Sequence, residues 1–84
     1  MNSGQLDLSI IIVNFNAGRY LERCLNSIKN FSGNFKYEII VVDNASTDNS
    51  LEILGKFPIE IKVMENSQNF GFSKAVNRGL SHRE

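Results

Sequence analysis

The stretch YEIIVVDNASTDNS, residues 37–50, decides the fold class. Its first six residues are a β-branched, almost entirely apolar run, and the rest is rich in Asn, Asp and Ser. Strands that are covered on both faces of a parallel sheet have such runs, whereas half-exposed hairpin strands alternate between apolar and polar residues. We therefore predict that residues 37–42 form a buried parallel strand that ends in a polar loop.

Two further strands are predicted on either side of this one. LSIIIV, residues 8–13, is another continuous apolar run. IEIKVM, residues 59–64, alternates and places Ile59, Ile61 and Val63 on one face, as expected of an edge strand with one wetter face.

Helical periodicity separates the strands. An apolar stripe spaced i, i+3, i+4, i+7 after Gly18 predicts a first helix with Cys24 as a core thiol, and a break is expected at residues 32–34. A second helix is predicted to start near Ser46, with the Ser46 hydroxyl as its cap and Asp48 in its first turn. A third is predicted to begin near Gly71. The three predicted stripes are Leu21, Cys24, Leu25 and Ile28; Leu51, Leu54 and Phe57; and Phe72, Ala75, Val76 and Leu80.

The resulting order is β-α-β-α-β-α, which predicts an α/β fold. Right-handed crossovers make the three strands parallel and adjacent, giving half of a doubly wound, Rossmann-like sheet.

The length and composition exclude several classes of function. The chain has 84 residues, enough for one small domain, and is 42% hydrophobic and 21% charged. Nine basic and nine acidic residues give a net charge of zero, which argues against general nucleic-acid binding. One cysteine excludes an internal disulfide framework. Without an evident signal peptide or membrane helix, we expect a cytoplasmic chain, with peripheral association with the inner face of the membrane as an open alternative.

The candidate site lies beyond the carboxyl ends of the strands, where open α/β sheets bind ligands. Three polar loops are expected there: residues 14–18, 43–48 and 65–71. Asp43 can accept a hydrogen bond from a base or a ribose, although Asp43, Asn44 and Ser46 can equally shape a turn and cap a helix. Phe15 can stack on a base or pack against the first helix.

The third loop and the helix that follows offer cations near free backbone N–H groups. Lys74 and Arg78, four residues apart, could hold a diphosphate; alternatively, Asn69 only caps the helix and both cations face solvent. Neither a P-loop nor a G-x-G-x-x-G fingerprint is present.

Three blocks together resemble a known family: LSIIIVNFNAGRYLERCLNSI, YEIIVVDNASTDNSLEIL and ENSQNFGFSKAVNRG. They look like the amino-terminal portion of family 2 glycosyltransferases, inverting enzymes of the GT-A fold that use nucleotide-diphosphate sugars and a divalent cation. The block NFGFSKAVNRG resembles the branch that includes rhamnosyltransferases of surface-polysaccharide assembly. The resemblance runs from about Leu8 to Leu80.

The resemblance implies roles for individual residues. Asp43 would accept the N3–H of uracil or thymine, beside Phe15. Asn16 would support the loop that carries Phe15, and Asn44 and Ser46 would support the turn that presents Asp43. The segment from Asn69 to Lys74 would border the nucleotide, with Lys74 near the phosphates.

The sequence departs from the family in lacking an Asp-x-Asp metal motif and an identifiable catalytic base. We therefore expect residues 1–84 to be a single partial domain, the nucleotide-binding half, cut before the Asp-x-Asp strand and inactive alone. The intact enzyme would transfer a sugar from a UDP- or dTDP-sugar to a saccharide or lipid-linked acceptor, using Mg²⁺ or Mn²⁺ for which this chain has no ligands. Whether the chain itself is an enzyme stays open. The alternative is a non-enzymatic half-domain that binds nucleotide or self-associates through an exposed sheet edge.

Overall fold

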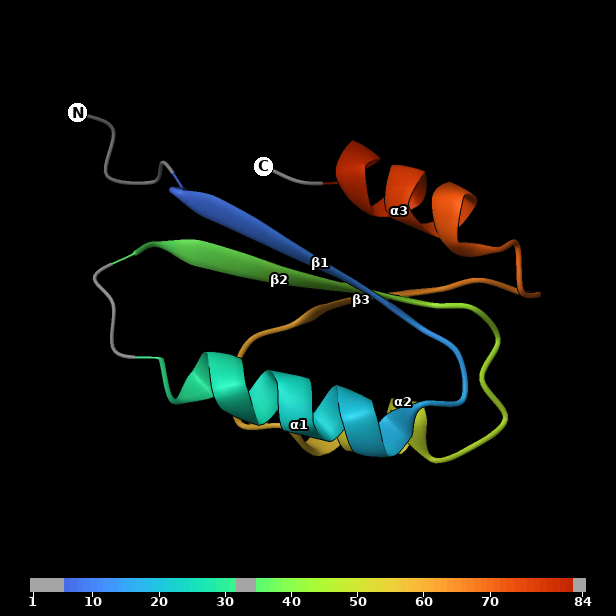
Figure 1. Ribbon diagram of the computed structural model, residues 1–84, viewed down its shortest axis with the longest axis horizontal. Helices are drawn as coiled ribbons and strands as arrows, with labels where there is room; N and C mark the ends of the chain where they lie inside the picture. The colour runs from blue at the N-terminus through green and yellow to red at the C-terminus, as the bar shows by residue number, and fades with distance from the viewer. Residues whose placement is uncertain (1–5, 32–34, 83–84) are drawn as a thin grey trace.

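A computed structural model describes residues 6–31 and 35–82, in which helices cover both faces of a central sheet. The elements are β1 (Leu8–Asn14), α1 (Gly18–Lys29), β2 (Tyr37–Asp43), α2 (Ser50–Lys56), β3 (Lys62–Glu65) and α3 (Phe72–Ser81). Helix α3 lies on one face of the sheet, and α1 and α2 lie on the other (Figure 1). The predicted α/β class and element order are confirmed.

The sheet has the strand order β1-β2-β3, and both pairs are parallel. Strand β1 pairs with β2 along its whole length, from Leu8 opposite Tyr37 to Asn14 opposite Asp43. The shorter β3 pairs only with the second half of β2 and ends with Glu65 opposite Asp43. All three strands therefore finish at the same edge of the sheet, which brings the loops that follow them together.

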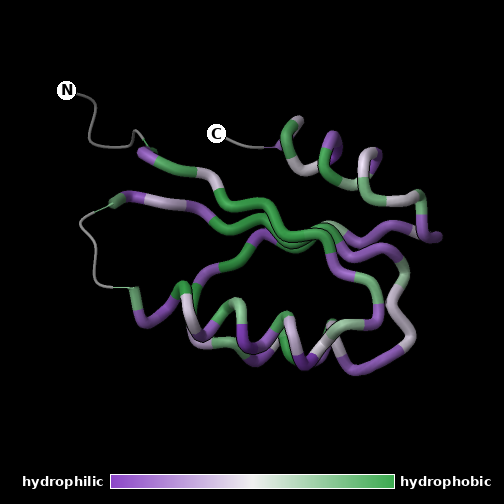
Figure 2. Tube along the Cα trace, viewed as in Figure 1, coloured by the Kyte–Doolittle hydropathy of each residue, from purple (hydrophilic) through white to green (hydrophobic). Residues whose placement is uncertain are grey.

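Alternate residues of the central strand supply two cores. Ile39 and Val41 face α1 and α2, and Ile40 and Val42 face α3. The strands form the apolar centre of the molecule, and hydrophilic residues are concentrated on the helices and loops around it (Figure 2). The buried partners of these residues are Leu21, Leu25 and Leu54 on the first face, and Met64 and Ala75 on the second.

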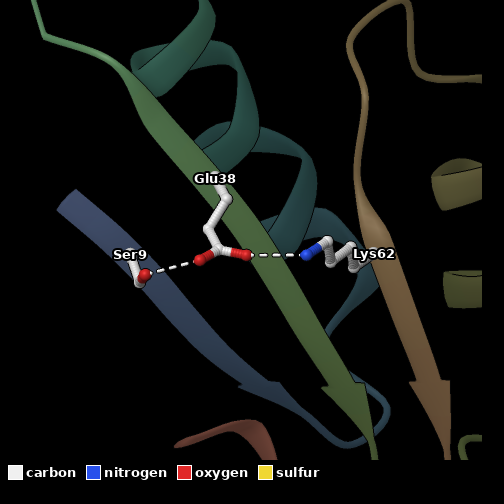
Figure 3. A network of polar contacts seen from close by, with 3 residues as sticks. All are labelled: Ser9, Glu38 and Lys62. Atoms are coloured by element: carbon white, nitrogen blue, oxygen red, sulfur yellow. Dashed lines mark hydrogen bonds and ion pairs between the residues drawn. The ribbon is translucent and has the colours of Figure 1, made fainter. Parts of the chain in front are cut away.

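One polar residue from each strand forms a network across the sheet (Figure 3). Glu38 accepts a hydrogen bond from the Ser9 hydroxyl at 2.7 Å and forms an ion pair with Lys62 Nζ at 3.0 Å. The Glu38 side chain is 8% exposed, so these contacts offset much of the cost of burying its carboxylate. The network accounts for Ser9 and Glu38 within the apolar runs of β1 and β2.

The third strand is shorter than predicted. It begins at Lys62 instead of Ile59, because the chain leaving α2 through Pro58 packs Ile59 and Ile61 against the α1–α2 core before it reaches the sheet. Val63 was expected to share their apolar face but is 40% exposed on the edge strand, and Met64 is buried instead.

The predicted start of the second helix near Ser46 is also wrong. Helix α2 starts at Ser50, and Asp48 precedes it. The backbone N–H groups of residues 46–48 donate to the side-chain oxygens of Asp43 and Asn16, which hold these residues in an irregular loop. Ala45 has a positive φ of 62°.

Several residues of the predicted helical stripes are exposed. Their burial was overestimated because none of them packs into either of the two apolar cores. These residues are Cys24, Leu51, Phe72 and Leu80. The predicted break at residues 32–34 lies outside the described residues. Within the described ranges, no helix combines the length and apolarity needed to cross a bilayer.

Candidate functional site

Backbone hydrogen bonds join the three polar loops where the strands end. The N–H of Asn44 donates to the carbonyl of Asn14, and the N–H of Asn66 donates to the carbonyl of Asp43, both at 2.8 Å. The parallel pairing thus continues one step beyond each strand. The three loops lie side by side at the carboxyl edge of the sheet, as predicted.

Asp43 lies at the centre of this edge and is 1% exposed. Its Oδ1 accepts hydrogen bonds from the Ser46 hydroxyl at 2.7 Å and from Asn14 Nδ2 at 2.9 Å, and its Oδ2 accepts from the Ser46 N–H at 2.9 Å. A carboxylate has about four lone-pair positions, so Oδ2 keeps acceptor capacity. Asp43 organises the second loop, and its predicted contact with a base stays a prediction.

Asn16 joins the first loop to the second. Its Oδ1 accepts from the Thr47 N–H at 2.6 Å and from the Asp48 N–H at 3.2 Å, and its own N–H donates to the Ser46 hydroxyl at 2.9 Å. Asn16 adopts a positive φ of 49°, a conformation that Asn tolerates better than most residues. The neighbouring Phe15 is 47% exposed, which leaves much of its surface open to a ligand.

Asp48 links the starts of two helices. Its Oδ2 accepts from the Gly18 N–H at 3.1 Å, and its Oδ1 accepts from the N–H of Ser50 at 3.0 Å and from the Ser50 hydroxyl. The Ser50 hydroxyl is the main cause that lowers the pKa of Asp48 below its ordinary value of 3.8; partial desolvation opposes the shift, and the backbone N–H groups of Gly18 and Ser50 reinforce it. The charged form is therefore favoured in the native state.

The lowered pKa of Asp48 predicts a dependence of stability on pH. A carboxylate with a depressed native pKa stabilises the fold above its unfolded pKa, and this contribution is lost as the pH falls through the native value. We expect Asp48→Asn to reduce the free energy of unfolding at about pH 6, and the difference from wild type to shrink as the pH is lowered to about 3. Urea unfolding across this range measures the difference. A difference that does not change with pH would contradict the assignment.

Side-chain amides connect the second and third loops. Asn66 Nδ2 donates to Asn44 Oδ1 at 2.7 Å, and Asn44 Nδ2 donates to the Gly71 carbonyl at 3.3 Å. Asn44 and Asn66 are both buried, whereas Asn69 is exposed and accepts the Gly71 N–H at 2.8 Å. Asn69 therefore shapes the chain just before α3 and does not directly cap the helix.

The two cations of α3 occupy different environments. Lys74 is exposed in the first turn. Arg78 Nη1 donates to Asn66 Oδ1 and to the Glu65 carbonyl, the latter at 3.3 Å, so it faces the end of β3. The predicted contact of these cations with phosphates stays a prediction.

Sequence reasoning missed two residues that hold the site together. Asn14 and Asn66 are buried and bind Asp43 and Asn44. The signal was available, because each apolar run is closely followed by an Asn or an Asp that parallel pairing places near its counterparts.

The described residues do not form a metal site. Nowhere in the described ranges do three His, Cys, Asp or Glu side chains gather around a position that could hold a metal ion. Asp43 and Asp48 each accept hydrogen bonds from donors around the site.

The comparison with known families agrees with this architecture. The sequence model described as "Glycosyl transferase family 2" matches residues 9–83. The chain belongs to glycosyl transferase family 2.

The relatives that this chain resembles in sequence are much longer than the chain. An uncharacterized glycosyltransferase of Haemophilus influenzae is 36% identical over 76 residues, which are 87% of this chain and 23% of the relative. The minor teichoic acid biosynthesis protein GgaA of Bacillus subtilis is 40% identical over 80 residues, which are 88% of this chain and 18% of that protein. The chain spans about a quarter or less of the length of these relatives.

A solved structure shares the fold. The mannosyltransferase PcManGT from Pyrobaculum calidifontis, in complex with GDP-Man and Mn²⁺, superposes with a TM-score of 0.82 at 24% identity, over 98% of this chain and 26% of that one. The family 2 chain thus has the architecture of part of a GT-A glycosyltransferase, and the predicted GT-A fold class is confirmed.

Proposed function

We propose that this chain is the nucleotide-binding half of an inverting glycosyltransferase, which transfers a sugar from a UDP- or dTDP-sugar to a saccharide or lipid-linked acceptor. The observation that carries the proposal is the joining of three polar loops at one edge of the sheet by buried side-chain hydrogen bonds. A preorganised polar edge at the carboxyl ends of parallel strands suits a phosphorylated ligand.

The names of the relatives support the proposal at a coarser level. They include a teichoic acid biosynthesis protein and a chondroitin synthase, and the structural neighbour is in complex with GDP-Man and Mn²⁺. We propose a role in polysaccharide assembly, in a branch close to rhamnosyltransferases on the strength of the NFGFSKAVNRG block. The proposed location is the cytoplasm, at or near the inner face of the membrane.

We assign the binding roles as follows. Asp43 Oδ2 accepts the N3–H of uracil or thymine, the exposed ring of Phe15 lies beside the base, and Lys74 faces the phosphates. Asn16 and Asn44 fix the two loops on either side.

An inverting displacement also needs a base to activate the acceptor hydroxyl and a group to stabilise the leaving diphosphate. Neither is assigned to a described residue, so the proposed work of these residues is to bind and orient the donor. The chain alone is expected to be catalytically silent.

A titration of the ¹⁵N-labelled chain with UDP, followed by amide NMR, tests this function. We expect shifts clustered at residues 15–16, 43–46 and 69–74. Lys74→Ala should weaken binding about fivefold, equivalent to about 1 kcal/mol, because one charge-assisted contact to phosphate is lost. Lys56→Ala is the matched control: it removes an exposed lysine from the last turn of α2, at the opposite end of that helix from Asp48, and should not alter the affinity.

Parallel titrations with dTDP and GDP separate the proposed pyrimidine preference from general nucleotide binding. A folded chain that ignores all three nucleotides would overturn the proposed function.

The alternative is a half-domain that associates through its sheet edge. Strand β1 lies at the edge of the sheet, and Leu8, Phe31 and Phe35 beside it are about half exposed. Peaks of β1 that broaden with protein concentration but ignore nucleotide would favour this alternative over nucleotide binding.

A further inference from the structure

Four residues form a directional chain of hydrogen bonds between α3 and the strand ends. Arg78 Nη1 donates to Asn66 Oδ1, Asn66 Nδ2 donates to Asn44 Oδ1, and Asn44 Nδ2 donates to the Gly71 carbonyl. Gly71 immediately precedes α3, and its carbonyl also accepts the N–H of Ala75. The hydrogen-bond chain therefore begins on α3, passes through the residues that directly follow β3 and β2, and ends at the residue before α3.

The chemistry of its two ends fixes the direction of the chain. A guanidinium can only donate, so Asn66 must present its oxygen to Arg78 and its NH₂ to Asn44. A carbonyl can only accept, so Asn44 must present its NH₂ to Gly71 and its oxygen to Asn66. Both buried amides thus have one satisfactory orientation. Hydrogen bonds aligned in this way polarise and strengthen one another, and the positive charge of Arg78 lies at the donor end of the series.

We propose that Arg78 is a positioning residue for the nucleoside diphosphate: it holds the loop of residues 66–71 in its binding conformation through Asn66 and Asn44. The proposal rests on the nucleotide-binding function proposed above. It gives Arg78 a different role from that of Lys74, which is exposed in the first turn of α3 and is proposed to face the phosphates.

The conformation of residues 67–71 depends on this chain of hydrogen bonds, because these residues make few others. Residues 67–70 are exposed, and Gly71 adopts a positive φ of 85°. Asn66 is held by its N–H bond to the Asp43 carbonyl. Beyond it, the hydrogen bonds of residues 67–71 are those that the Gly71 carbonyl accepts from Asn44 Nδ2 and from the Ala75 N–H, and the local bond from the Gly71 N–H to Asn69 Oδ1. Without the donor at position 78, Asn66 and Asn44 can rotate, and the loop has to be ordered when the ligand binds, which weakens affinity.

The test compares Arg78→Ala, Arg78→Lys and Arg23→Ala in the full 84-residue chain. Arg23 is an exposed arginine of α1, so Arg23→Ala removes the same side chain without touching the site. The probes are UDP affinity and the side-chain ¹⁵NH₂ signals of Asn44 and Asn66. A purely structural role predicts changes in the midpoint of unfolding alone, whereas a positioning role predicts changes in both probes below that midpoint.

We expect Arg78→Ala to weaken UDP binding about tenfold and to move both amide signals toward those of exposed asparagines. Arg78→Lys keeps a donor-only group and should restore most of both properties, and Arg23→Ala should leave both unchanged. Unaltered UDP affinity in a folded Arg78→Ala variant would overturn the positioning role while the proposed function stood. Failure of the wild-type chain itself to bind UDP would overturn the proposed function and, with it, the role of Arg78.

Discussion

Replacing Asp43 with alanine is expected to destabilise the native state by about 3 kcal/mol, because hydrogen-bond donors inside the site lose their acceptor. The Ser46 N–H loses its acceptor, and Asn14 Nδ2 keeps only its longer 3.1 Å bond to the Ser46 hydroxyl. An 84-residue chain has a small reserve of stability, so a loss of this size should lower the midpoint of thermal unfolding by about 15 °C.

Urea and thermal unfolding followed by circular dichroism measure this effect. Glu65→Ala is the matched control, since Glu65 stands opposite Asp43 in the sheet but is exposed and should tolerate the change. A folded Asp43→Ala variant with wild-type stability would show that the hydrogen bonds to Ser46 and Asn14 contribute little. The expected loss also means that Asp43→Ala alone is a poor test of nucleotide binding.

The second large effect is expected where α3 meets the sheet at Gly79. A Cβ atom added at this position would lie 2.7 Å from Ile11 Cγ2 and 3.4 Å from Val42 Cγ2, so the helix rests almost directly on β1 and β2. Gly79→Val forces α3 away from both strands and should cost about 3 kcal/mol, the upper end of overpacking penalties. The better helix propensity of valine returns only about 0.3 kcal/mol.

The same substitution at Gly55 is the control. Nothing lies within 4 Å of an added Cβ there, so Gly55→Val should be close to neutral. Unfolding curves of the two variants, measured side by side, separate overpacking from propensity. Equal stability of the two variants would contradict the close approach of α3 to Ile11.

The fold was predictable because buried parallel strands give continuous apolar runs that are easy to recognise in the sequence. The apolar run around Ile40 and the loops that follow each run were sufficient to predict the order, direction and neighbours of the strands. Boundaries were harder where tertiary contacts override local propensity. Ser46 looks like a helix cap, but Asp43 and Asn14 engage it, and the helix starts four residues later.

The candidate site was only partly predictable for a related reason. The sequence indicated that Asp43, Asn16 and Asn44 lie on adjacent loops, and the structure brings them together. It did not reveal that most of their hydrogen-bonding groups are directed at one another, because an Asn that binds a neighbour and an Asn that binds a ligand look the same in sequence. The bond between Arg78 and Asn66 was hidden for the same reason, since Asn66 lies twelve residues earlier in the loop that follows β3.

The sequence separation of the contacts at the strand ends has a kinetic consequence. Asn14 and Asp43 are 29 residues apart, Asn16 and Ser46 are 30 apart, and Asn44 and Asn66 are 22 apart. Such contacts form only after long loops have closed, an entropic cost that slows folding relative to helix formation. Any state of the chain in which these loops have not yet closed would therefore lack the binding edge. A nucleotide at that edge would bind the completed fold alone, slowing unfolding rather than guiding the first steps of folding.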